Sequence, residues 1–273
     1  MMTYFKNNTP DVNEKGLYVY CIMPKDVVTI HDQKGIDGEG SLFLVQYREL
    51  VAVVSEVKLK DFKLSMVAKE MVMEWAEEKV RIHEKIVERL MKENDLLPTS
   101  FGSIVSNKEA LIDLMTDKYY EYISVLEKLK GKEEWTIKAY LSFEKFKQAL
   151  EDNTPEIRKR KEILSALSKS DAFLMKRKID NLVKEQMDIR LENVLLHIVE
   201  VLRKVSECEA FSNVEFPKHQ KDNSIILKAS YLVKKSIFQD FLQQINKLTD
   251  ELESEGITFE VIGPWPPYSF VED

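Results

Sequence analysis

Cysteine, glycine and proline are scarce in this chain. The two cysteines, Cys21 and Cys208, can form neither a disulfide framework nor a Cys-x-x-Cys metal motif, so a reducing compartment is expected. Eight glycines and eight prolines in 273 residues favour long regular elements over a loop-rich fold. No run approaches the roughly 20 apolar residues of a membrane span, and the first residues lack an apolar signal-peptide core. These absences predict a soluble cytoplasmic protein that does not bind membranes.

An excess of positive charge is also missing. The chain has 40 basic and 47 acidic residues, for a net charge of -7. Nucleic acid binding needs a basic face that neutralises phosphates, so nucleic acid is not expected as a partner. The one basic run, RKRK at 158–161, has acidic neighbours and is typical of a solvated helix face. With 44% hydrophobic residues, the chain can still form a substantial folded core.

The first 130 residues predict strands followed by helices. The strand signals are short runs of β-formers, whereas the helix signals are apolar residues spaced three and four apart. Asn107 is a suitable N-cap and Gly131 a suitable C-cap for the second helix. The expected strands are 16–23, 42–47, 50–57 and 99–105, and the expected helices are 66–94 and 107–130.

The remaining residues predict a second α+β pattern. Residues 155–209 are almost continuously helical, but a single helix of that length would be unusual, so a break within 165–171 and a helical hairpin are expected. Around this hairpin we expect strands at 135–143, near Val214, at 224–233 and at 257–262, and helices at 144–151 and 236–255.

This order of elements resembles the ferredoxin-like βαββαβ pattern. We therefore predict an α+β protein of two small domains related to that fold, with long helices. The N-terminal domain would span 1–130, including a connecting helix. The C-terminal domain would span 131–273, with the helical hairpin inserted and a tail of prolines and aromatics. A single continuous sheet is the alternative.

Residue patterns of catalysis and of metal binding are absent from the sequence. There is no GxSxG, no phosphate-binding glycine loop and no HExxH. Ser100 and Ser103 flank Phe101-Gly102, yet no base is placed beside them by the sequence. We predict no enzyme activity, no cofactor and no metal site, with His83 a partly buried structural residue. The histidines are scattered, at His31, His83, His197 and His219.

The C-terminal segment, GPWPPYSFVED from residue 263, does not resemble ordinary core. Its three prolines fix φ and remove backbone donors, so we expect a stiff, extended tail. The tail could fold back as a lid over a core, or it could present a rigid aromatic surface to a partner. The candidate partner-binding residues are Trp265, Pro266, Pro267, Tyr268 and Phe270.

The same segment, GPWPPYSFV at 263–271, resembles the C-terminal signature of the gas vesicle protein family GvpF/GvpL. Further segments resemble the family in the same order along nearly the whole chain. The chain has Ser100 where the family often has Arg before Phe-Gly, which fits an L-type member better than an F-type member. The supporting segments are LYVYCI at 17–22, LVAVVSE at 50–56, HEKIVERLM at 83–91, PTSFG at 98–102 and EWTIKAY at 134–140.

The resemblance implies an accessory role in nucleation or assembly of the gas vesicle, a hollow protein shell in the cytoplasm that gives buoyancy. Its implied partners are the small hydrophobic shell protein and other gas vesicle accessory proteins. The family has no known catalytic residues, so none is assigned. Two other classes stay open from the residues themselves. One is a ligand-sensing regulatory module of paired ferredoxin-like domains, and the other is a hydrolase with an unrecognised site.

Overall fold

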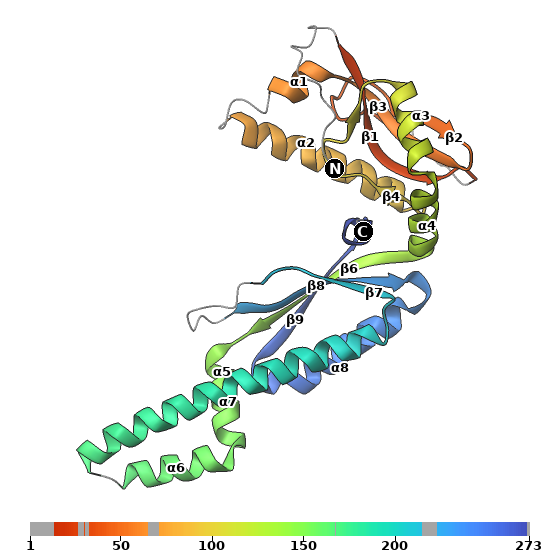
Figure 1. Cartoon of the computed structure of the whole chain (residues 1–273). Helices are drawn as coiled ribbons and strands as arrows, with labels where there is room; N and C mark the ends of the chain where they lie inside the picture. Colours follow the sequence, from red (N-terminus) through yellow and green to blue (C-terminus); the bar gives the residue numbers. More distant parts are fainter. Residues whose placement is uncertain are drawn as a thin grey trace. The chain divides into compact units, whose positions relative to one another are not determined.

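A computed structural model describes residues 14–26, 30, 33–64, 71–166, 168–214 and 223–271. The chain forms two compact units, Met1–Glu134 together with Pro264–Asp273, and Trp135–Gly263 (Figure 1). The domains expected from the sequence were 1–130 and 131–273. The structure differs in one important respect, because the C-terminal segment groups with the first unit rather than with the second.

A five-stranded sheet forms the centre of the first unit. Its strand order is β2-β3-β1-β4, and β5 also pairs with β1. β1 and β3 are antiparallel along their whole length, which positions Lys15 opposite Lys58 and Pro24 opposite Leu50. The prediction of a strand at 99–105 was wrong, because only the last two of these residues form a strand and the residues before them form a loop. The strands are β1 (Lys15–Pro24), β2 (Phe43–Tyr47), β3 (Leu50–Lys58), β4 (Leu97–Pro98) and β5 (Ile104–Val105).

An irregularity in β1 decides which side chains face which layer. The register with β3 shifts between Val19 and Cys21, so one extra residue is accommodated there. Because of this bulge, Tyr20 and Cys21 both join the core that also holds Tyr18. Val19 belongs to the core on the opposite face of the sheet. The bulge thereby turns Cys21 into the same core as its neighbour Tyr20, whereas Tyr18 and Tyr20 share a face through the ordinary alternation of a strand.

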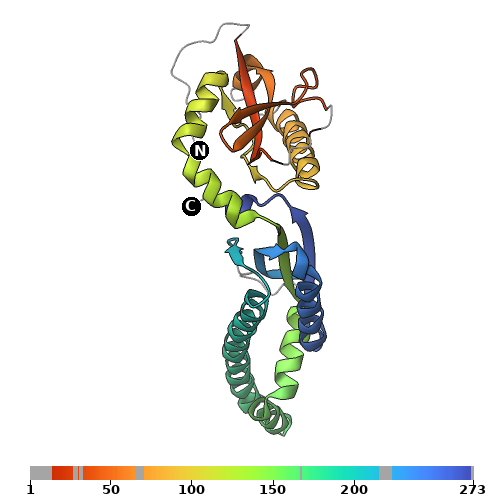
Figure 2. The ribbon, with the colours of Figure 1, turned by 90° about the vertical axis from the view of Figure 1, so that its right-hand side faces the viewer.

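Helices cover both faces of this sheet (Figure 2). Ile86, Val87 and Leu90 of α2 pack on one face, whereas α3 and α4 pack on the other. The single helix expected at 107–130 is interrupted at Lys118, while Asn107 caps its start by accepting a hydrogen bond from the Ala110 amide at 2.9 Å. Residues 66–70 of the expected helix 66–94 lie outside the described residues. The helices are α1 (Leu59–Leu64), α2 (Met71–Met91), α3 (Lys108–Asp117) and α4 (Tyr119–Leu129).

The second unit has the ferredoxin-like order predicted from the sequence. Its four-stranded sheet runs β7-β8-β6-β9, so the first and third strands of the βαββαβ pattern are neighbours in the middle. The short strand expected near Val214 lies earlier, at Cys208–Phe211, where it overlaps the last two residues of the helical stretch expected at 155–209. Cys208 pairs with Leu232 and Phe211 with Ala229. The strands are β6 (Lys132–Leu141), β7 (Cys208–Phe211), β8 (Ser224–Lys234) and β9 (Ile257–Trp265).

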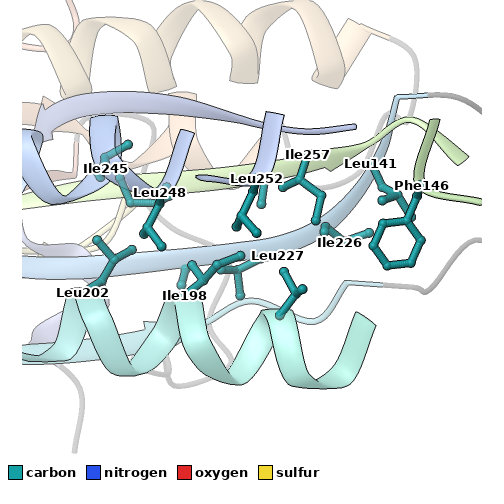
Figure 3. Close-up of a cluster of buried hydrophobic side chains, with 14 of the residues drawn as sticks. Leu141, Phe146, Ile198, Leu202, Ile226, Leu227, Ile245, Leu248, Leu252 and Ile257 are labelled. Carbon is teal, nitrogen blue, oxygen red and sulfur yellow. The ribbon is translucent and has the colours of Figure 1, made fainter. Parts of the chain in front are cut away.

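One continuous core holds the second unit together (Figure 3). α8 contributes buried residues three and four positions apart, including Ile245 and Leu248, while Ile198 and Leu202 of α7 lie beside them. The predicted helical hairpin is confirmed as α6 followed by α7. The helices are α5 (Phe143–Asn153), α6 (Pro155–Ser165), α7 (Lys169–Arg203) and α8 (Phe238–Leu252), with 3-10 turns η1 (Lys235–Ile237) and η2 (Glu253–Glu255) beside α8.

Gly256 ends the last of these turns in the left-handed region, at φ 78°. A Cβ there would lie 2.7 Å from the Cβ of Lys145. Only glycine satisfies both the backbone conformation and this close approach. Gly256 therefore ends the helical segment and leads the chain directly into β9.

Candidate functional site at the C-terminal segment

The C-terminal segment is extended at first and then turns. β9 continues through Pro264 to Trp265 at an edge of its sheet, where a proline without an amide donor is tolerated. After two buried prolines, the chain makes the 3-10 turn η3 (Tyr268–Phe270), in which the Phe270 amide donates to the Pro267 carbonyl at 3.2 Å. The stiff extended tail expected from the sequence is thus correct only as far as Trp265.

Tyr268 lies against His83 of α2. The hydroxyl oxygen of Tyr268 is 3.0 Å from Nε2 of His83, and the hydroxyl oxygen of Tyr18 is 3.0 Å from Nδ1. The Tyr18 hydroxyl also accepts a hydrogen bond from the amide of Gly102 at 3.0 Å. A neutral imidazole satisfies both contacts, with one ring nitrogen donating and the other accepting. His83 is only 2% exposed, in agreement with the structural role expected from the sequence.

Burial keeps this cluster uncharged near neutral pH. It lowers the pKa of His83 to about 4, and a hydrogen bond with the backbone of Thr99 opposes only part of that shift. Burial also raises the pKa of Tyr18 and of Tyr268 well above the usual range for tyrosine. The contacts of Tyr18 and Tyr268 with His83 are therefore hydrogen bonds between neutral groups, and they hold the C-terminal segment against α2.

A second anchor holds the residues that follow Tyr268. The carboxylate of Glu134 accepts a hydrogen bond from the Ser269 amide at 3.0 Å and another from the Ser269 hydroxyl at 2.6 Å. Phe270 is buried, and Val271 packs against the core formed with α3 and α4. The end of the described chain is therefore part of the first unit's packing.

The five candidate partner-binding residues divide into two groups. Pro266, Pro267 and Phe270 are buried, and Tyr268 is half-buried with its hydroxyl on His83. These residues act as the lid that was one interpretation of the tail. Trp265 is 36% exposed, so its indole remains available to a partner. Its role in binding stays a prediction.

Phe101 is a further candidate that the sequence pattern did not single out. Its ring centroid is 6.1 Å from that of His83 and 6.4 Å from that of Tyr18, and 36% of the residue remains exposed. Gly102 follows it with φ 83°, a left-handed conformation that suits glycine and turns the chain here. The sequence signal that could have identified Phe101 is an aromatic residue immediately before this glycine in PTSFG at 98–102.

The other candidates do not assemble into a chemical site. The Ser103 hydroxyl donates to the Ser100 carbonyl at 2.7 Å, which is a local turn contact. His197 lies 3.3 Å from Glu251 at the surface, whereas His31 and His219 lie outside the described residues. Among the residues that the structure describes, no three His, Cys, Asp or Glu side chains are grouped to hold a metal. No helix in that part of the chain is long and apolar enough to cross a membrane.

Comparisons with known proteins agree over nearly the whole length. The profile of the family described as gas vesicle synthesis protein GvpL/GvpF matches residues 16–272. Gas vesicle protein L of Streptomyces sp. (strain CB03234) is 24% identical over 93% of this chain and 91% of its own. Gas vesicle protein F1 of Halobacterium salinarum is 22% identical over 94% of this chain and 93% of its own.

A solved structure shows the same fold. The crystal structure of the gas vesicle protein GvpF from Anabaena sp. PCC7120 superposes with a TM-score of 0.71 at 20% identity. The match covers 95% of this chain and 99% of the other. The α+β class expected from the sequence is confirmed by this likeness and by the two sheets described above.

Proposed function

Because the chain belongs to the gas vesicle synthesis protein GvpL/GvpF family, we propose that it is a cytoplasmic accessory protein in the nucleation and assembly of the gas vesicle shell. It acts by binding the shell protein, other accessory proteins of the vesicle, or both. The observation that carries this proposal is the family match from residue 16 to residue 272, which includes both units and the C-terminal segment. No catalytic step is part of the proposed role.

Trp265 and Phe101 are the proposed contact residues. Aromatic side chains with an exposed face dominate the binding energy of many protein interfaces. Both residues adjoin groups that are held rigidly, since Trp265 precedes the buried prolines and Phe101 packs beside His83. A fixed backbone reduces the entropy that is lost on binding. An apolar shell protein that has not yet assembled would be a suitable partner, because its exposed apolar surface must be covered.

Co-purification tests the proposal. The tagged chain is expressed with the shell protein and the other vesicle accessory proteins, and the proteins that it retains are identified. Trp265→Ala should weaken retention by about thirtyfold, the effect of losing a hot-spot residue, without unfolding the protein. Tyr120→Ala is the matched control, since Tyr120 is a more exposed aromatic on α4. Full retention by a folded Trp265→Ala variant would remove Trp265 from the interface, and recovery of no vesicle protein by the wild type would contradict the function.

A further inference from the structure

The outer face of α7 carries apolar side chains that no part of the described chain covers. Leu174, Ile189 and Leu196 are between 48% and 61% exposed, although leucine and isoleucine are usually buried. They lie on one side of the helix, because 22 residues at about 100° each return Leu196 close to the direction of Leu174. Three charged residues, Lys178, Glu185 and Glu192, lie on the same face between Leu174 and Leu196.

This face points away from the core of its own unit. Val183, Val194 and Ile198 of α7 are buried in that core, on the side of the helix that faces away from Leu196. Arg190 fixes the rotation of the helix further, because its guanidinium makes two hydrogen bonds to Glu255, at 2.9 Å and 2.5 Å. The exposed apolar residues are therefore held outward by the packing, and a rotation of α7 cannot bury them.

The charged residues between them are arranged symmetrically about Glu185. Lys178 lies seven positions before Glu185 and Glu192 lies seven positions after it, while Leu174 and Leu196 lie eleven positions on either side. In the described part of the chain, none of these three charged side chains forms an ion pair. A two-fold antiparallel contact between identical helices places residues at equal distances from its centre opposite each other, so these opposite charges would pair across it.

We propose that this face of α7 binds a second copy of the same chain in an antiparallel, two-fold symmetric contact. Glu185 lies on the two-fold axis, and Lys178 of each copy meets Glu192 of the other. Leu174 and Leu196 meet at both ends, and Ile189 fills the space beside the centre. The contact extends for about 33 Å along each helix, at 1.5 Å per residue.

The two Glu185 side chains lie opposite each other at the axis of this dimer. Like charges that face each other weaken an interface, so the dimer is expected to be reversible and dependent on concentration. Lys184 and Asp188 are exposed on one flank of the face, where Lys184 of one copy approaches Asp188 of the other. These flanking pairs offset part of the repulsion, since exposed ion pairs contribute modestly but occur twice in a symmetric dimer.

Sedimentation equilibrium of the full-length chain tests the proposal over about a hundredfold range of concentration. The wild type should pass from monomer to dimer. Lys178→Glu and Glu192→Lys should each raise the dissociation constant at least about fivefold, and the double substitution should restore it. Glu185→Gln should lower the dissociation constant about threefold, because it removes the like-charge contact on the axis.

Cross-linking locates the contact. In a Cys208→Ser background, Glu185→Cys should form a disulfide-linked dimer on mild oxidation, because a residue on the axis meets its own copy. The remaining native cysteine, Cys21, is buried. Asp180→Cys is the control, since Asp180 is exposed on another side of α7. A wild type that stays monomeric, a double substitution that does not restore dimerisation, or equal cross-linking of both variants would overturn the proposal. Binding of another vesicle protein to this face in place of a second copy would also overturn it.

Discussion

The hydroxyl of Tyr268 lies 3.0 Å from Nε2 of His83, a residue 185 positions earlier in the chain. This contact joins the C-terminal segment to α2 at the buried edge of the first unit's core. Through the other ring nitrogen of His83, the same interaction continues to Tyr18 of β1. The last described residues are thus part of the hydrogen-bonded interior of the unit that begins the chain.

Removing the Tyr268 hydroxyl tests this link. Tyr268→Phe leaves Nε2 of His83 buried without that partner, so the free energy of unfolding should fall by about 1–2 kcal/mol. Urea unfolding at pH 7 measures the change. Tyr120→Phe is the control, because that tyrosine is largely exposed and its substitution should have little effect. In a double-mutant cycle with His83→Gln, a coupling energy near zero would show that the contact contributes nothing to stability.

Because of His83, the free energy of unfolding should decrease as the pH drops below about 6.5. Its pKa is about 4 in the folded protein and about 6.5 when unfolded, so between these values the unfolded chain binds the proton more readily. The contribution of the neutral ring is fully present above pH 6.5 and is lost as the pH falls towards 4. A shift of this size corresponds to about 3 kcal/mol.

The difference in free energy of unfolding between the wild type and His83→Gln separates the effect of His83 from that of the carboxylates, which titrate in the lower part of the same pH range. The free energy of unfolding of the wild type should decline more steeply between pH 6.5 and pH 4 than that of the variant. Tyr18, Tyr20 and Tyr268, which face the ring, stay neutral throughout that range. Parallel pH profiles for the two proteins would rule out a depressed pKa for His83.

The lid role of the tail predicts a cost for deleting its last buried aromatic. Phe270→Ala should lower the free energy of unfolding of the first unit by about 3–5 kcal/mol, because the lost ring leaves a cavity. Trp265→Ala removes a partly exposed ring and should cost much less. Thermal unfolding followed separately in each unit measures the loss of stability in the first unit, because the second unit has its own core. Equal effects of the two substitutions would mean that the tail is not anchored as described.

Much of the fold could be predicted because its signals are local. The alternation of β-formers and the helical spacing at Phe241, Ile245 and Leu248 depend only on neighbours in the sequence. The break at Lys118 carries no proline or glycine, so one helix was expected where there are two. The short strand Cys208–Phe211 exists because β8 pairs with it, a distant contact that a local pattern does not contain.

The candidate site was predicted in composition but not in arrangement. The aromatic and proline content of the tail indicated an unusual segment, yet the sequence could not show that Tyr268 would bond to His83 or Ser269 to Glu134. Both contacts depend on the chain returning to the first unit after passing through the second. The bulge at Tyr20, which brings Cys21 to the same face as Tyr20, has no glycine to reveal it.

Vesicle formation in cells tests the central claim most directly. Cells that express a complete set of gas vesicle genes are compared with cells in which this chain is omitted, restored, or restored as Trp265→Ala, and vesicles are counted by electron microscopy. The account predicts few or no vesicles without the chain, recovery with the wild type, and poor recovery with a Trp265→Ala variant present at the same level. Normal numbers of vesicles in cells that lack the chain would contradict an accessory role in assembly.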